Sequence, residues 1–97
     1  MEEMIYYSEL YDLYGELLTE KQKNYFEDYY FSNLSFSEMS ENYQISRNAV
    51  HKQVKEACEK LVYYDSVLKL KEKKEKIEKI SNKIREERIK EELLKIF

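Results

Sequence analysis

Residues 40–50 read SENYQISRNAV, and this stretch decides the fold. A polar helix-forming run ends at Tyr43, Ile45 stands alone between polar residues, and Ser46 begins a new amphipathic run. Only about two or three residues connect the two runs, so the chain must turn a sharp corner there. Such a corner is either an ordinary connection with a solvated face or the turn of a helix-turn-helix that presents its second helix to DNA.

Capping signals predict where three helices begin. Thr19 with Gln22 and Ser35 with Glu38 each have the spacing of a capping box. Ser46 repeats the capping residue, without an acid three positions later. We therefore expect helix starts at residues 19, 35 and 46, and a recognition helix over about residues 46–63.

The composition favours one small all-α domain. Charged residues make up 38% of the 97 residues and apolar residues 42%, with one Gly and no Pro. The single cysteine, Cys58, has no partner for an internal disulfide and is expected to be a buried apolar filler. The first residues are acidic and contain no long apolar run, so we expect a cytoplasmic protein with no signal peptide and no membrane association.

The second helix of the corner has an apolar side and a polar side. The expected inward set is Met39, Tyr43, Ile45, Val50 and Val54. The expected nucleic-acid-binding residues are Ser46, Arg47, Asn48, His51, Lys52 and Lys55. Arg47 suits a bidentate hydrogen bond to guanine and Asn48 one to adenine, whereas Lys52 and Lys55 suit phosphate contacts. Ser46 and the free amides that follow it could also hold a phosphate.

Other kinds of site find little support in the sequence. His51 has no Cys or His partners for a metal, so we expect a polar surface residue and no metal site. There is no nucleophile–base set and no Gly-rich phosphate loop, so we expect neither an enzyme nor a cofactor. Most of the ten tyrosines fall on helical stripes, which favours a core role over stacking on RNA bases.

A family resemblance rests on residues from about Tyr11 to about Leu70. The segments Leu18-Thr19-Glu20-Lys21-Gln22, Tyr29-Tyr30, Leu34-Ser35, Ser46-Arg47 and Ala49-Val50 resemble the YlxM family of small helix-turn-helix proteins. That family looks like the promoter-reading region 4 of sigma factors. The resemblance implies a bacterial DNA-binding regulator connected with the signal recognition particle pathway, whose genes neighbour those of the family. Where the family's turn often has Gly this chain has Gln44, so a left-handed Gln44 would cost about 1–2 kcal/mol.

Two rival functions stay open. Glu38 and Glu41 on the first helix, and Glu56 and Glu59 on the second, would repel DNA if they faced it. A protein–protein adaptor that keeps the fold without binding DNA is therefore one rival. An RNA-binding accessory factor of the same pathway is the other.

The sequence predicts a boundary near residue 65 between a helix-turn-helix domain, residues 1–65, and a charged extension, residues 66–97. Residues 66–97 carry eleven Lys and Arg and seven Glu, and strong helix formers dominate them, so we expect one long C-terminal helix. Leu70, Ile77, Ile80 and Ile84 form a short heptad-like seam on it. We expect this helix either to form a homodimer or to pack back on its own domain.

Overall fold

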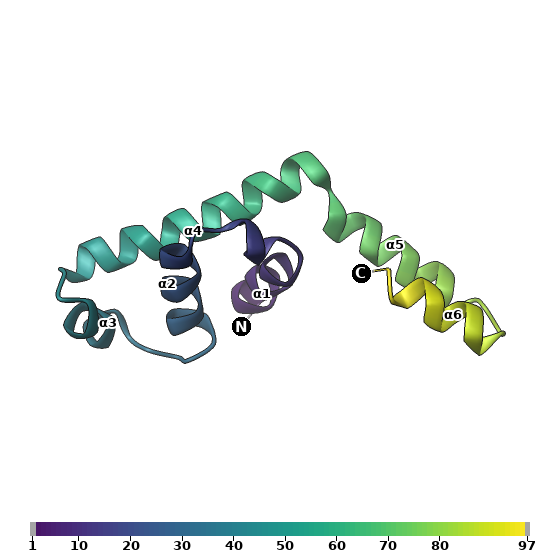
Figure 1. Cartoon of the computed structure of the whole chain (residues 1–97), viewed down its shortest axis with the longest axis horizontal. Helices are drawn as coiled ribbons and strands as arrows, with labels where there is room; N and C mark the ends of the chain where they lie inside the picture. The colour runs from purple at the N-terminus through teal and green to yellow at the C-terminus, as the bar shows by residue number, and fades with distance from the viewer. Residues whose placement is uncertain (1, 97) are drawn as a thin grey trace.

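The computed structural model describes residues 2–96, and every regular element in that range is helical. The helices are α1 (Glu2–Tyr14), a 3-10 turn η1 (Gly15–Leu17), α2 (Glu20–Tyr30), α3 (Phe36–Tyr43), α4 (Arg47–Leu68), α5 (Leu70–Ser81) and α6 (Glu87–Leu94). Figure 1 shows α1, α2 and α3 on one side of the long α4, with α5 and α6 continuing beyond its end. The predicted all-α class is confirmed.

All three predicted helix starts are confirmed by their caps. Thr19 and Ser35 form complete capping boxes with Gln22 and Glu38, and the Ser46 hydroxyl accepts a hydrogen bond from the Ala49 amide. Each cap satisfies amides that have no partner within the helix, so the chain has a defined entry into α2, α3 and α4.

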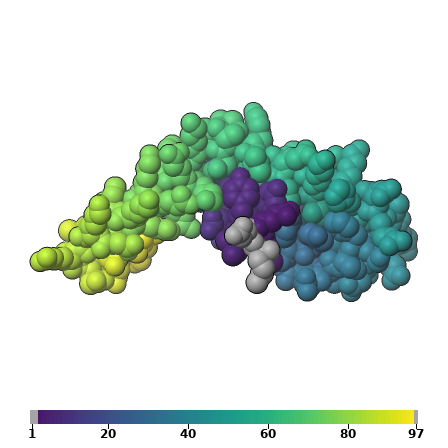
Figure 2. All heavy atoms as spheres, turned by 180° about the vertical axis from the view of Figure 1, so that it is seen from behind, coloured from purple at the N-terminus to yellow at the C-terminus, as the bar shows by residue number. Residues whose placement is uncertain are grey.

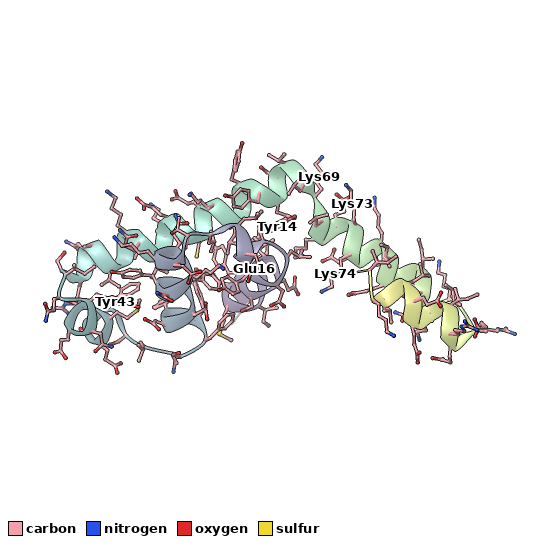
Figure 3. The ribbon with its side chains drawn as sticks, viewed as in Figure 1. Tyr14, Glu16, Tyr43, Lys69, Lys73 and Lys74 are labelled. Carbon is pink, nitrogen blue, oxygen red and sulfur yellow. The ribbon has the colours of Figure 1, made fainter. Side chains whose placement is uncertain are left out.

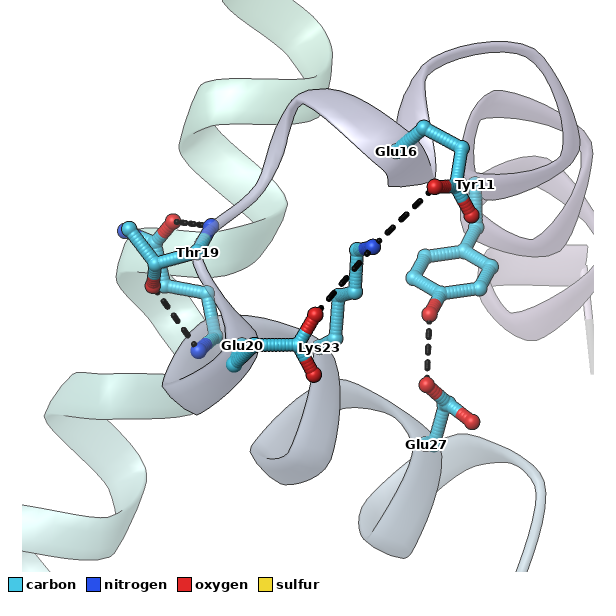
Figure 4. Close-up of polar contacts among 7 residues, drawn as sticks. Tyr11, Glu16, Thr19, Glu20, Lys23 and Glu27 are labelled. Carbon is cyan, nitrogen blue, oxygen red and sulfur yellow. Dashed lines mark hydrogen bonds and ion pairs between the residues drawn. The ribbon is translucent and has the colours of Figure 1, made fainter.

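Polar contacts also fix the joint between α1 and α2 (Figure 4). The Lys23 ammonium lies 3.3 Å from the Glu16 carboxylate and 3.7 Å from that of Glu20. The Tyr11 hydroxyl donates to the Glu27 carboxylate at 2.6 Å. The Tyr11 ring stacks on Phe26, with 4.6 Å between ring centroids, so the two helices are joined by both polar and aromatic contacts.

The core lies between α4 and the three helices that cover it. Its buried members are Leu10, Tyr14, Leu18, Tyr25, Phe26, Met39, Val50, Val54, Ala57, Cys58 and Leu61. Every one of these residues precedes residue 62. We call residues 2–68 the head, because it contains this buried set.

The expected single C-terminal helix is not what the structure shows. The chain turns at Lys69, which has a left-handed φ of 54°, and helix α5 ends at Ser81 before α6 folds back along it. We call residues 70–96 the arm. Helix α4, which the sequence predicts as a recognition helix, runs to Leu68, past the predicted end near residue 63.

Long-range hydrogen bonds account for the turn at Lys69. The Tyr14 hydroxyl donates to the Asp65 carboxylate at 2.6 Å and accepts from the Leu70 amide at 2.9 Å. The same Asp65 oxygen accepts from the Lys71 amide at 3.2 Å. These bonds satisfy amides at the start of α5, which lacks a capping side chain of its own.

The arm gives the molecule the shape of an arch. The principal extents are 54 × 25 × 22 Å and the radius of gyration is 16.6 Å, against about 12–13 Å for a compact chain of this length. Figure 2 shows α1 on the inner side of the arch, between the rest of the head and the arm. None of the helices in residues 2–96 has the length and apolar character needed to cross a membrane.

Candidate nucleic-acid interface

The corner between α3 and α4 is built by three residues. Gln44 takes a left-handed conformation, with φ 56°, and its amide donates to the Ser40 carbonyl. The Ile45 amide donates to the same carbonyl at 3.2 Å, and the Ser40 hydroxyl donates back to the Ile45 carbonyl. Ser46 then caps α4. Three residues, 44–46, therefore separate α3 from α4 and fix the direction in which α4 begins.

Beneath the corner lies the expected inward set. Met39 and Val50 are fully buried and Val54 is 4% exposed. Tyr43 and Ile45 are half-buried at the edge of the set. The five residues thus lie on the inner side of the corner, although Ile45 is less enclosed than the others.

Tyr43 ties α3 to α2. Its ring stacks on Tyr25, with 4.3 Å between ring centroids, and its hydroxyl donates to the Asp28 carboxylate. Burial, and then this hydrogen bond, raises the pKa of Tyr43 to about 12. The first helix of the corner is therefore attached to the core by an aromatic contact and a charge-assisted hydrogen bond.

The six candidate binding residues all lie exposed at the start of α4. They are Ser46, Arg47, Asn48, His51, Lys52 and Lys55. At 100° per residue, Asn48 and Lys52 point away from the buried side of α4. Arg47 and His51 lie on the flank that faces α3. The structure therefore brings the six together over three helical turns, but on two neighbouring faces.

Contacts within the chain orient the flank residues. Arg47 Nη1 donates to the Ser37 hydroxyl at 3.3 Å. The His51 ring meets Phe36 edge-on, with 5.4 Å between ring centroids. Ser37 and Phe36 could not be predicted from the sequence, because their contacts depend on the angle of the corner and leave no local signal. Both residues belong to the first turn of α3, so the starts of the two helices form one surface.

The electrostatic character of this surface is mixed. Residues 36–59 contain three Lys and Arg and four Glu. The Lys55 ammonium lies 3.9 Å from the Glu59 carboxylate, and both side chains are largely exposed. An exposed pair of this kind contributes only about 0–1 kcal/mol, so Lys55 can exchange Glu59 for a phosphate at little cost.

A shallow pocket adjoins the interface on the side of α1. His51 and Lys55 line it together with Glu3, Cys58 and several aromatic residues of the head. Cys58 itself is 6% exposed, and burial raises the pKa of its thiol to about 11. The thiol therefore stays protonated at neutral pH, as expected of an apolar filler. In the part of the chain that the structure describes, no group of three His, Cys, Asp or Glu side chains could hold a metal ion.

Comparison with known proteins also indicates a helix-turn-helix family. A family model, UPF0122, described as "Putative helix-turn-helix protein, YlxM / p13 like", matches residues 1–96. The UPF0122 protein of Clostridium kluyveri is 47% identical over 78 residues, which cover 80% of this chain and 70% of that protein. The UPF0122 protein of Fusobacterium nucleatum is 35% identical over all 97 residues and 94% of its own length. No solved structure matches the chain. The chain belongs to the UPF0122 family of YlxM-like helix-turn-helix proteins.

Proposed function

We propose that this protein is a DNA-binding regulator that inserts the first turns of α4 into the major groove of duplex DNA. The observation that carries the proposal is the corner at residues 44–46. It holds Arg47 and Asn48 exposed at the start of α4, directly above the buried Met39 and Val50. N-terminal residues of a recognition helix are those that reach base edges.

Each candidate residue has a distinct role in the proposed complex. Arg47 and Asn48 read guanine and adenine edges, while Lys52 and Lys55 contact phosphates. Ser46 uses its hydroxyl to cap the Ala49 amide. The Arg47 and Asn48 amides are thereby left to bind a phosphate at the positive end of the helix dipole. His51 adds a polar group beside Arg47 on the flank.

The test compares alanine variants on a duplex selected from a random-sequence pool. Arg47→Ala should weaken binding to the selected site by about 1–3 kcal/mol and relax its sequence preference. Lys52→Ala should weaken binding to all duplexes alike. Lys60→Ala, an exposed lysine farther along α4, is the matched control and should bind like wild type. Equal binding by wild type and an Arg47/Lys52/Lys55 triple-alanine variant would refute the proposal.

Binding should also be weak and sensitive to salt. The chain has a formal net charge of −3, and the interface offers few cations. Neutralised phosphates supply most of the non-specific affinity for DNA, so a monomer has little of it. With three cations at phosphates or bases, the slope of log K against log salt should be about −3 or shallower.

A protein–protein adaptor is the second candidate, favoured by the acidic residues at the interface. Glu38, Glu41 and Glu56 lie on the two helices that would face DNA. From the YlxM resemblance we propose that the regulated process is the signal recognition particle pathway, whether through DNA, RNA or a protein component. Affinity capture from lysate with and without nuclease separates these possibilities. Partners lost with DNase indicate DNA, partners lost with RNase indicate RNA, and partners retained after both indicate the adaptor.

A further inference from the structure

The protein exposes more surface than a folded chain of its mass should. Its accessible area is 7197 Å², whereas a compact monomer of 11.9 kDa exposes about 6,000 Å². The excess is larger than the roughly 800 Å² that each partner buries in a standard protein interface. The arm is the source of this excess, because it projects from the head and contributes little to the core (Figure 1).

The outer side of α5 carries a basic stripe. Lys73, Lys76 and Ile80 are exposed and follow one another at spacings of three and four residues, which places them on one helical face. Figure 3 shows Lys73 on the outer side of the arm and Lys74 on the inner side. Lys74 lines a small crevice with Glu9 and Leu13 of α1. The stripe therefore points away from the head of its own chain.

The outer side of α1 carries the complementary stripe. Ile5, Glu9 and Asp12 are exposed and follow one another at spacings of four and three residues. Glu9 also pairs with Lys71 of its own arm at 3.4 Å, whereas Asp12 forms no ion pair within residues 2–96. Residues 1–20 contain six acidic residues and no Lys or Arg, whereas residues 69–85 contain eight Lys and Arg and three Glu. The head near α1 and the arm are thus oppositely charged.

The two stripes match in reverse order. With the helices antiparallel, Ile5 meets Ile80, Glu9 meets Lys76, and Asp12 meets Lys73, all in one register. Glu9 and Lys76 would exchange their partners within the chain, Lys71 and Glu72, and partly exposed ion pairs of this kind contribute little. Within one chain the stripes cannot meet, because that of α5 faces away from α1. We propose that they meet between two copies, so that the protein forms a two-fold symmetric homodimer in which each arm packs against α1 of the partner.

The arch provides the space for this contact. Helix α1 lies on the inner side of the arch (Figure 2). The arm of a second copy could therefore lie inside the arch, with its basic stripe turned towards α1. Two-fold symmetry repeats the contact at the other end. The contact would cover Ile5 and Ile80, which are 55% and 58% exposed in the single chain. It is independent of the proposed DNA binding, because it uses no residue of α3 or of the first turns of α4.

Reversing the charge of Asp12 or of Lys73 tests the proposed contact between α1 and the partner's arm, in the full-length protein without DNA. Asp12 and Lys73 are suitable because neither forms an ion pair with another residue in the range 2–96. Sedimentation equilibrium at low salt should show a wild-type dimer. Asp12→Lys alone and Lys73→Glu alone should each weaken self-association at least about tenfold, because each reversal places like charges at two symmetric contacts. An equimolar mixture of the two variants should recover wild-type affinity, since both contacts in the mixed dimer then pair opposite charges.

Two further variants complete the design. Glu41→Lys makes the same charge change on the exposed surface of α3 and should leave the dimer unchanged. Ile80→Asp should give a monomer, and its thermal unfolding curve should match that of wild type at concentrations low enough to keep both monomeric, because Ile80 is outside the core. A monomeric wild type at high micromolar concentration, a dimer indifferent to Asp12→Lys, or a mixture that fails to recover affinity would each overturn the proposal.

Discussion

Val50 illustrates how single residues set the corner on which the proposed function depends. Its side chain is fully buried where α3 meets α4, two residues beyond the exposed Asn48. An Asp at position 50 would be an uncompensated charge in the core, so we expect Val50→Asp to destabilise the head by several kcal/mol. Thermal unfolding followed by circular dichroism measures the change.

The matched control for Val50 is Asn48→Asp, which adds the same charge on the exposed side of the same helical turn. It should change the free energy of unfolding by less than about 0.5 kcal/mol. A Val50→Asp variant that unfolds as cooperatively and at the same temperature as Asn48→Asp would show that the register of α4 is wrong.

Buried tyrosines give the stability a dependence on alkaline pH. Burial, and then the hydrogen bond to Asp65, raises the pKa of Tyr14 to about 12 from an ordinary value of 10.0. The folded state therefore keeps a proton that the unfolded chain releases above pH 10. The stabilisation is complete below pH 10 and is lost as the pH rises towards 12, by at most about 1.4 kcal/mol per pH unit for each such tyrosine.

Urea unfolding at pH 9, 10 and 11 tests this dependence. Stability should fall across the series, and Tyr14→Phe should make the fall shallower because one titrating group has been removed. The slopes are compared, not the absolute stabilities, since Tyr14→Phe also removes the hydrogen bonds to Asp65 and Leu70. Identical slopes in the two proteins would show that Tyr14 titrates normally.

At the scale of the elements, the corner tolerates a residue that is poorly suited to it. Gln44 adopts a left-handed conformation that favours Gly, and its side chain is exposed. We expect Gln44→Gly to stabilise the protein by about 1 kcal/mol by relieving the strain of a Cβ at positive φ. The change in urea midpoint measures the effect.

Asn42→Gly is the control for this prediction, because residue 42 is exposed but helical. Glycine there should destabilise α3 by up to about 1 kcal/mol. If both glycine variants lost stability, Gln44 would contribute an interaction that outweighs its backbone strain.

The same elements show how far the sequence alone could go. The starts of α2, α3 and α4 were predictable, because Thr19, Ser35 and Ser46 cap their helices through residues only three positions away. The turn at Lys69 was not, because it depends on Tyr14, a residue 56 positions before Leu70. The start of α6 was also missed. Glu86, which resembles one more charge on a solvated face, instead caps the helix by accepting from the Arg88 and Ile89 amides.

At the candidate interface the sequence predicted which residues are exposed, but it did not predict that they lie on two neighbouring faces of α4. Helical periodicity placed Asn48 and Lys52 away from the core. The contacts of Arg47 with Ser37, and of His51 with Phe36, required the angle between α3 and α4. The roles of these residues in DNA binding remain predictions.

The whole molecule consists of a head that contains the buried core and an arm that is attached at few points. The main direct links are the hydrogen bonds from the Leu70 amide to the Tyr14 hydroxyl and from the Lys71 amide to the Asp65 carboxylate, packing of the half-buried Leu70, and the Lys71–Glu9 ion pair at 3.4 Å. A chain that ends at Leu68 should therefore still fold. We expect it to lose about 1–3 kcal/mol, from two hydrogen bonds and one partly buried leucine.

Thermal and urea unfolding of the truncated chain, at concentrations low enough to keep the full chain monomeric, measure this loss. The reference is Tyr14→Phe in the full chain, which removes the same hydrogen bond to Leu70 but leaves the arm in place. If the arm adds little to the free energy of unfolding of the head, both variants unfold in one cooperative transition that is nearly as steep as that of wild type. An unfolded truncated chain beside a folded Tyr14→Phe variant would mean that the arm stabilises the head through contacts beyond those named above. The head would then depend on the arm, even though every buried apolar side chain lies at or before Leu61.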